Sequence, residues 1–244
     1  MCFVPALRAF AAAGWRLAVL CCTNGHGGGD AAVRSRELVA AGRVLGMEAD
    51  DITILSHPAL PDSMSAAWDP LVVRGVVATE AVKRGADAVL TFDDRGVSGH
   101  INHRSAHAGV ALYATQGTAV PCYSLDTVPL LRKFSAAADI ALSAVLHLAR
   151  GGASTAAAWP HRLLLVAPTP TASYAAMSAH ASQYVWFRRL FVAFSRYTWV
   201  NTLTALPRQA TDAVPAAAAA PPDSTGPGGS ARRRPAAPAA APPR

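Results

Sequence analysis

A chain of 244 residues is long enough for one α/β domain with a sizeable core and a tail. The composition is 52% hydrophobic, but much of this fraction is alanine, and no run of about 18 residues carries the large apolar side chains of a membrane-spanning helix. The net charge of +7 is scattered along the chain, which argues against a dedicated nucleic-acid-binding module.

The beginning of the chain predicts a helix followed by a strand. In residues 1–13, Phe3, Leu7 and Phe10 recur at helical spacing, and a glycine ends the pattern. Residues 16–22 are almost continuously apolar, as in a parallel strand that is covered on both faces. Because a βαβ unit begins with a strand, we expect a preceding strand to be the missing partner of this pair.

A glycine-rich loop over residues 23–30 separates this strand from a predicted helix over residues 31–45. The backbone N–H groups of such a loop can bind an anion, and Arg34 near the start of the helix can hold a phosphate. A flexible turn fits the same pattern. The loop lacks the Gly-x-Gly-x-x-Gly spacing of a dinucleotide site, so a Rossmann-like nucleotide-binding protein is a weaker alternative.

The next predicted elements are a strand over residues 51–55 and a helix over residues 70–84. The valines of the helix form an apolar stripe, and Gly85 ends it. His57 lies in the connecting loop, but no acidic pair follows it at metal-ligand spacing. We therefore interpret His57 as an ordinary loop residue.

The stretch 88–103 has the layout of an active-site edge. A short apolar strand over residues 88–92 ends at two aspartates and opens into a loop with glycines that leads to His100 and His103. Ligands of α/β sheets collect at the carboxyl ends of strands, and two imidazoles at this spacing can face one point. The pair fits a zinc site, or one metal ligand beside one catalytic group. On spacing alone, two surface histidines beside a turn fit as well.

The second half of the chain continues with strands and helices, followed by a tail. Residues 120–125 and 163–167 predict strands, and residues 104–113, 130–148 and 171–181 predict helices. Residues 149–160 are rich in Gly, Ala and Ser, which is typical of a surface insertion. From residue 207 the Pro-, Ala- and Arg-rich composition predicts a disordered tail, so we expect one domain over residues 1–206 and a tail over residues 207–244.

Residues 184–200 combine aromatic and basic side chains. As a helix, this segment places Trp186, Leu190, Phe194 and Tyr197 on one face and its arginines on the other. Such a helix fits a membrane interface, with the arginines at the lipid head groups. A helix packed against the sheet has the same pattern.

Several segments together resemble the PIG-L/LmbE-like zinc deacetylases. The family's second metal motif is matched by residues 91–93 (Thr-Phe-Asp), 96–100 (Gly-Val-Ser-Gly-His) and 102–103 (Asn-His). The run 180–190 (His-Ala-Ser-Gln-Tyr-Val-Trp-Phe-Arg-Arg-Leu) closely resembles the C-terminal signature of the eukaryotic members that act in GPI-anchor synthesis. Apart from the insertion and the tail, the resemblance spans nearly the whole chain.

The resemblance implies an α/β fold of the Rossmann-like, LmbE-like type, with a mostly parallel sheet, helices on both faces and the first strand missing. It implies a zinc-dependent amide hydrolase that de-N-acetylates N-acetylglucosaminyl-phosphatidylinositol at the cytoplasmic face of the endoplasmic reticulum membrane. The implied partners are this lipid substrate and, through residues 186–197, a membrane surface, without nucleic acid.

The resemblance also assigns roles to individual residues. His103 is the implied metal ligand, and His100 stabilises the oxyanion or protonates the leaving amine. The substrate contacts that it implies are Arg34, Asp93, His180 and Gln183.

The family's first metal motif, of the form Ala-His-Pro-Asp-Asp-Glu, does not occur in this sequence. In the family it supplies a His ligand, an Asp ligand and the Asp base. Residues 1–5 resemble the residues that follow it, so we expect these groups to lie outside the sequence given. A substitute ligand would have to come from Asp93 or Asp94. Two functions therefore stay open: a zinc-dependent deacetylase, and a relative that binds a sugar-phosphate lipid or a partner without hydrolysis.

Overall fold

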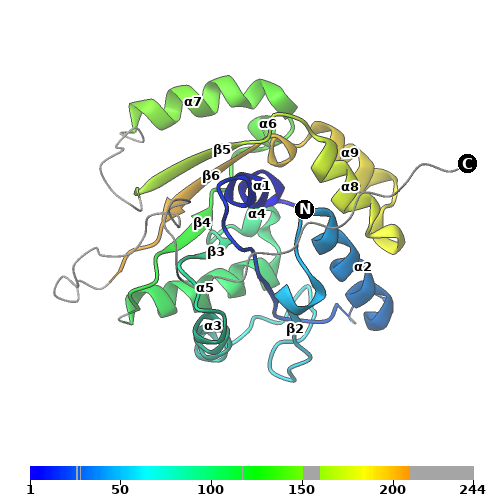
Figure 1. The fold of residues 1–244 in the computed structure, drawn as a ribbon, viewed down its shortest axis with the longest axis vertical. Coiled ribbons are helices and arrows are strands. Elements are labelled where there is room, and N and C mark those ends of the chain that lie inside the picture. Colours follow the sequence, from blue (N-terminus) through cyan, green and yellow to red (C-terminus); the bar gives the residue numbers. More distant parts are fainter. Residues whose placement is uncertain (26, 28, 117, 151–159, 209–244) are drawn as a thin grey trace, which may run out of the picture.

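The computed structural model describes residues 1–25, 27, 29–116, 118–150 and 160–208. In this part of the chain the strands form two sheets (Figure 1). The first sheet pairs β1 (Val19–Cys21) in parallel with β2 (Ile52–Ile54). The second sheet has the order β3-β4-β6-β5 and consists of β3 (Val89–Phe92), β4 (Cys122–Leu125), β6 (Val200–Ala205) and β5 (Arg162–Val166).

The second sheet is mixed in direction. Strands β3 and β4 run parallel, whereas β6 runs antiparallel to both of its neighbours, β4 and β5. The predicted α/β class is confirmed, but the expectation of a mostly parallel sheet is not. The reason is β6, a strand for which the sequence pattern made no prediction and which enters the sheet in the opposite direction.

Most helices lie where the sequence predicts them. Helix α3 (Pro70–Arg84) has the predicted bounds because its ends are chemically marked. The Asp69 side chain accepts the N–H of Leu71, Pro70 occupies the first turn, and Gly85 follows in the left-handed conformation with φ +57°. Further helices are α1 (Val4–Ala12), α2 (Ala31–Val44), α5 (Ile101–Thr115) and α8 (Thr171–Ser178).

The predicted helix over residues 130–148 is interrupted. It consists of α6 (Leu130–Lys133), the 3₁₀-helix η3 (Ala136–Ala138) and α7 (Asp139–Ala149). At the break Ala136 has φ +49°, a backbone conformation that a right-handed helix excludes. The continuous helix was therefore a wrong prediction.

The helix in the aromatic segment is also shorter than the sequence predicts. Helix α9 (Trp186–Phe194) ends before the 3₁₀-helix η5 (Arg196–Thr198), and β6 follows. Tyr197 is fully buried, and its hydroxyl donates to the backbone carbonyl of Asp126. Tyr197 therefore does not lie on the exposed face of Trp186. The placement that helical spacing predicts for Tyr197 is wrong.

Two layers of helices enclose the second sheet. Along β4, the adjacent residues Cys122 and Tyr123 belong to different core clusters, because successive side chains of a strand point to opposite faces. The Tyr123 face is covered by α1, and the Cys122 face is covered by α3 and α5 (Figure 1). The cluster under α3 also includes Leu20 of β1, so both sheets share this core.

A buried ionic network joins α7 to the turn before β6. Asp139 accepts hydrogen bonds from Arg132 Nε at 2.7 Å and from Ser143 Oγ at 2.7 Å. Arg196 is fully buried, with its Nε 2.6 Å from Asp139 Oδ2 and its Nη2 donating to Ser143. The network joins the neighbouring helices α6 and α7 to η5, which lies 53 residues after Ser143 along the chain, and it gives the buried charge of Arg196 its partners.

Two predictions fall largely outside the described residues: the insertion, of which residues 151–159 are not described, and the tail, of which residues 209–244 are not described. The division into a domain over residues 1–206 and a tail stays a prediction. In the part of the chain that the structure describes, no helix has both the length and the apolar character needed to cross a membrane.

Candidate active site at the carboxyl end of β3

The loop after β3 is fixed by the carboxylate of Asp93. Its Oδ1 accepts the N–H of Gly96 at 3.0 Å, and its two oxygens accept the hydroxyl and the N–H of Thr127, each at 2.6 Å. Thr127 lies just after β4, so Asp93 connects the ends of two parallel strands. This carboxylate orders the loop, and its predicted contact with a substrate stays a prediction.

The short turn α4 (Gly96–Gly99) contains a strained residue. Val97 has φ +66°, which is a rare conformation for a β-branched residue. Two side chains hold it there, because Thr127 Oγ1 accepts its N–H at 2.8 Å and Lys133 Nζ donates to its carbonyl oxygen at 3.0 Å. The turn that leads to His100 is therefore held by residues of the β4–α6 connection.

The two predicted histidines lie side by side with their ring centroids 4.9 Å apart. His100 is the N-cap of α5, where its Nδ1 accepts the N–H of Asn102, so the neutral ring carries its proton on Nε2. His103 Nδ1 lies 3.0 Å from the carbonyl oxygen of Gly96, which can only accept, so the lone pair is on Nε2. One imidazole thus presents a donor and the other an acceptor.

His103 is held in its uncharged form. Burial lowers its pKa, and the charge of His100 lowers it further, although the hydrogen bond to Gly96 opposes the shift. The ring also stacks on Phe92 at a centroid distance of 3.8 Å. A neutral imidazole with an oriented ring and a free Nε2 lone pair is the form that binds a metal ion.

The predicted substrate residues form a second group, on α2 and on the segment before α9. Glu37 of α2 accepts the N–H and the hydroxyl of Ser182, at 2.6 and 2.7 Å. Burial alone would raise the pKa of Glu37, but the bonds from Ser182 outweigh this effect and lower it. Arg188 donates to the side-chain oxygen of Gln183 at 2.9 Å. Arg34 precedes Glu37 by three residues on α2, and the Glu37–Ser182 bonds join this helix to the segment that carries Gln183. Burial, and after it the charge of Arg34, lowers the pKa of Arg188.

His180 belongs to the same group and is uncharged at neutral pH. Burial lowers its pKa to about 4, with smaller contributions from the amino terminus and Arg188, against the opposing charge of Glu37. Its Nδ1 is buried and has no hydrogen-bond partner among the described residues. The predicted contact of Arg34, His180 and Gln183 with a substrate stays a prediction.

Asp62 connects the two groups. Its Oδ1 accepts a hydrogen bond from Asn102 Nδ2 at 3.2 Å, next to the histidine loop, and its Oδ2 lies 3.4 Å from Arg34 Nη1. Arg34 also donates to the carbonyl oxygen of Gly25 at 2.6 Å, so the glycine-rich loop wraps around this side chain. Nothing in the spacing of the sequence singled out Asp62.

A cavity of about 340 Å³ borders Asp93 from the side of α7. Its lining includes Asp126 and Arg162, which form an ion pair of 2.7 Å, but neither His100 nor His103. The histidine pair therefore lies outside this cavity.

Replacing Thr127 by valine is expected to lower the free energy of unfolding by about 1–3 kcal/mol, because the buried N–H of Val97 and the Asp93 carboxylate both lose a partner. Urea denaturation measures the change. Thr115→Val is the matched control, since that exposed hydroxyl bonds only to carbonyls of its own helix and its loss should change stability by less than about 0.5 kcal/mol. Equal effects of the two substitutions would contradict the assigned role of Thr127.

Comparison with known proteins identifies the family of this chain. Residues 1–114 match the family model described as PIG-L, GlcNAc-PI de-N-acetylase. The N-acetylglucosaminyl-phosphatidylinositol de-N-acetylase of Bos taurus is 32% identical over 209 residues, which cover 84% of this chain and 78% of that protein. The probable enzyme of the same name from Dictyostelium discoideum is 28% identical and covers 83% and 87%. The probable enzyme from Schizosaccharomyces pombe is 29% identical and covers 77% and 74%. The resemblance seen in the sequence is confirmed, and the chain belongs to the PIG-L family of GlcNAc-PI de-N-acetylases.

Proposed function

We propose that this chain hydrolyses the N-acetyl group of N-acetylglucosaminyl-phosphatidylinositol in GPI-anchor biosynthesis. The products are acetate and glucosaminyl-phosphatidylinositol. The observation that carries the proposal is the arrangement of two groups, the His100/His103 pair and the Arg34/Gln183 group, which Asp62 connects. The relatives described above are named for this activity.

In amide hydrolysis, water adds to the acetyl carbonyl, and the C–N bond then breaks as the amine takes up a proton. The Nε2–H of His100 points away from its own helix cap and is free to donate to the oxyanion or to the leaving nitrogen. His103 presents the lone pair of Nε2 beside it. This division of roles follows from the two tautomers.

On the substrate side, the Glu37–Ser182 bonds join α2, which carries Arg34, to the segment whose Gln183 is bonded by Arg188. A phosphodiester such as that of phosphatidylinositol is the kind of anion that guanidinium groups bind through paired hydrogen bonds. Gln183 and the neutral ring of His180 supply further polar contacts for a sugar. We assign this group to the binding of the sugar-phosphate part of the substrate.

The family resemblance implies zinc, which would supply an activated water. A catalytic zinc site takes three protein ligands and an open position. Among the described residues, His103 and its neighbour His100 are available, but no three His, Cys, Asp or Glu side chains gather at one point. The donors in this part of the chain thus do not fit a complete zinc site, and no step above depends on the metal.

For the fold, we propose that one further parallel strand belongs between β1 and β3. Within the described residues, β1 pairs with β2 alone and β3 with β4 alone. Leu20 of β1 and Val89 of β3 nevertheless pack into the same cluster. A strand in this position would join the two sheets into one sheet of the Rossmann-like type.

For location, we propose the cytoplasmic face of the endoplasmic reticulum membrane, where the lipid substrate of the resembled enzymes is processed. Contact with the membrane surface would involve the segment that includes α9, which is exposed and basic. This part of the proposal is supported by the family names and by the character of α9.

The proposal is tested by measuring acetate release from N-acetylglucosaminyl-phosphatidylinositol in detergent micelles, with and without added zinc. We expect release that is lost in His103→Ala and kept in His57→Ala, because His57 lies on an exposed loop and caps only its own turn. Acetate release that His103→Ala leaves unchanged would contradict the role of His103, and no release in any condition would contradict hydrolysis by this chain.

A second candidate function is binding of the same lipid without hydrolysis. The observation that favours it is the lack of a three-donor group among the described residues. It predicts that the chain retains N-acetylglucosaminyl-phosphatidylinositol on equilibrium dialysis, that Arg34→Gln weakens this binding, and that no acetate appears. Acetate release would favour the hydrolytic function over binding without hydrolysis.

A further inference from the structure

Helix α9 carries an aromatic stripe that faces away from the core. Trp186 is 73% exposed, and Phe187, Leu190 and Phe194 lie on the same side and are exposed as well. Val192, on the opposite side, is fully buried. Only a narrow face of the helix is therefore buried, and large apolar side chains are exposed to solvent. An ordinary surface helix buries its apolar face instead.

Helix α6 extends this apolar area. Leu131 is 89% exposed, and Leu130 and Phe134 are exposed beside it. The ring of Phe134 meets Phe191 of α9 edge to face, with centroids 6.1 Å apart, so the two helices are in contact. Figure 1 shows α6 next to α9 along one side of the molecule. We call this area the α6/α9 surface, which consists of Leu130, Leu131, Phe134, Trp186, Phe187, Leu190 and Phe194.

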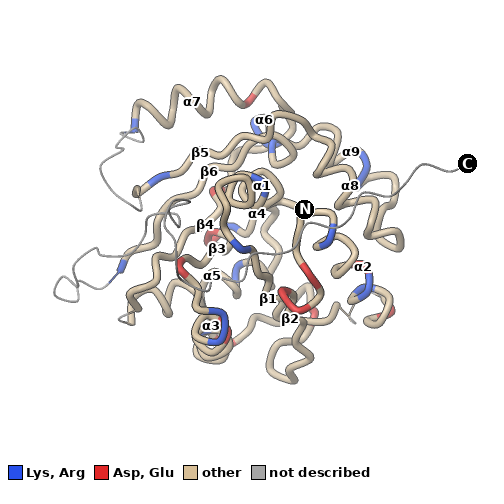
Figure 2. The backbone as a smooth tube through the Cα atoms, in the orientation of Figure 1, with Lys and Arg blue, Asp and Glu red and all other residues tan. Residues whose placement is uncertain are grey.

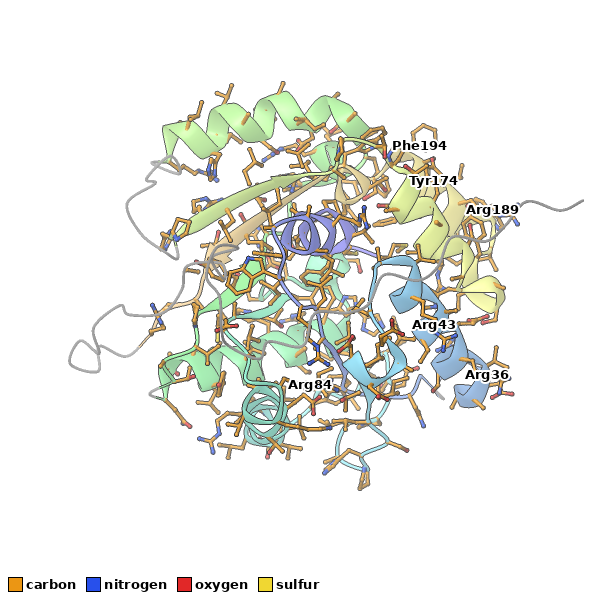
Figure 3. All side chains as sticks on the ribbon, viewed as in Figure 1. Arg36, Arg43, Arg84, Tyr174, Arg189 and Phe194 are labelled. Carbon is orange, nitrogen blue, oxygen red and sulfur yellow. The ribbon has the colours of Figure 1, made fainter. Side chains whose placement is uncertain are left out.

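The charges of the two helices have one sign. Helix α9 contains Arg188 and the exposed Arg189 and no acidic residue, whereas the basic side chains of α6 have inward partners, Asp139 for Arg132 and the Val97 carbonyl for the buried Lys133. Figure 2 shows basic positions on both helices, and Figure 3 shows Arg189 and Phe194 at the outer side of α9. Exposed apolar side chains with basic residues beside them are complementary to an anionic lipid interface.

The surface adjoins both groups of the candidate site. Lys133 of α6 donates to the carbonyl oxygen of Val97, in the turn that leads to His100. Arg188 of α9 donates to Gln183 in the substrate group. A bilayer on the α6/α9 surface would bring a lipid head group to the same edge of the molecule.

We propose that the α6/α9 surface docks on an anionic lipid bilayer, with Leu131 and Trp186 inserted at the level of the head groups and Arg189 beside them. This proposal rests on the proposed function, since it explains how the site reaches a phosphatidylinositol lipid. A second copy of the chain is a poorer occupant, because it would bring the like-charged Arg188 and Arg189 of two α9 helices to the same surface with no acidic residue in α9 to pair with them.

The test is sedimentation of the full chain with vesicles of phosphatidylcholine, with or without phosphatidylserine. The vesicles contain no N-acetylglucosaminyl-phosphatidylinositol, so binding is measured independently of hydrolysis. We expect binding that is stronger to the anionic vesicles. The double variant Leu131→Ser/Trp186→Ser should bind about tenfold or more weakly, because two exposed apolar anchors are lost. Arg189→Gln should weaken only the binding to anionic vesicles, about fivefold.

Val82→Ser is the matched control. Val82 is 82% exposed on α3, away from the α6/α9 surface. Its substitution by serine should leave vesicle binding unchanged. A loss of vesicle binding in Val82→Ser as large as in the double variant would overturn the proposal. The proposal would also be overturned if the wild-type chain bound neither type of vesicle. The exposure of the substituted side chains keeps the variants folded, which circular dichroism checks.

Two further results separate this proposal from its alternatives. Sedimentation equilibrium could show a dimer of the wild-type chain and a monomer of the Leu131→Ser/Trp186→Ser variant. That result would assign the surface to a second copy of the chain instead. Acetate release from micellar substrate without any vesicle binding would refute the docking surface and leave the proposed function standing. Vesicle binding without acetate release would support the surface and contradict hydrolysis.

Discussion

Replacing Asp139 by asparagine is expected to lower the free energy of unfolding by about 3–5 kcal/mol, because it leaves the guanidinium of Arg196 buried without a counter-charge. Arg196 is fully buried and lies 2.6 Å from the carboxylate, so water cannot replace the lost partner. The substitution also removes charge from the bonds to Arg132 and Ser143. Urea denaturation followed by fluorescence measures the loss.

The same network predicts a dependence of stability on acid. Burial alone would raise the pKa of Asp139, but the hydrogen bonds from Arg132 and Ser143 and the charge of Arg196 outweigh it and lower the pKa. A carboxyl group whose pKa is lower in the folded state contributes its full stabilisation above the unfolded-state pKa of about 3.9, and this is lost as the pH falls below that value. Asp139→Asn should therefore flatten the acid limb of the stability profile.

The control for Asp139 is an ion pair of equal length at the surface. Arg16 Nη2 lies 2.6 Å from Asp51 Oδ1, but the Arg16 side chain is 77% exposed. Arg16→Gln should lower the free energy of unfolding by less than about 1 kcal/mol. A loss below about 1 kcal/mol for Asp139→Asn as well would show that burial does not raise the contribution of this network.

The sequence pattern located the elements whose ends carry local signals. Helix α3 has an aspartate cap, a proline in its first turn and a glycine after its last turn, so its predicted bounds agree with the structure. Strand β6 carries the polar residues Asn201 and Thr202 in its buried stretch, and it was missed. The partners that satisfy Asn201 are the N–H of Ala6 and the carbonyl of Cys2, which no local pattern reveals.

The candidate site was predictable to a similar extent. His100 and His103 follow a strand, and the motif placed them at its carboxyl end, where the structure has them. The side chains that hold their loop, Thr127 and Lys133, come from beyond the next strand and had no signal of their own. The link through Asp62 depends on a loop conformation, and a pattern of residue types contains no information about it.

Replacing His100 by asparagine is expected to lower kcat for de-N-acetylation by about 10²–10⁴-fold, the usual contribution of a general acid or base, with a smaller change in KM. Asparagine keeps the N-cap of α5, because its side-chain oxygen can accept the N–H of Asn102 as His100 Nδ1 does. It has no group in the position of the imidazole Nε2–H. The effect is therefore confined to the chemical step, provided that the free energy of unfolding changes by less than about 0.5 kcal/mol.

The matched variant His100→Ala separates the two roles of this residue. It removes the cap as well, and we expect a further loss of about 1 kcal/mol in the free energy of unfolding with the same fall in kcat. Full activity in His100→Asn together with a loss in His100→Ala would mean that His100 only caps the helix. That result would leave His103, whose ring lies beside that of His100, as the functional imidazole of the loop.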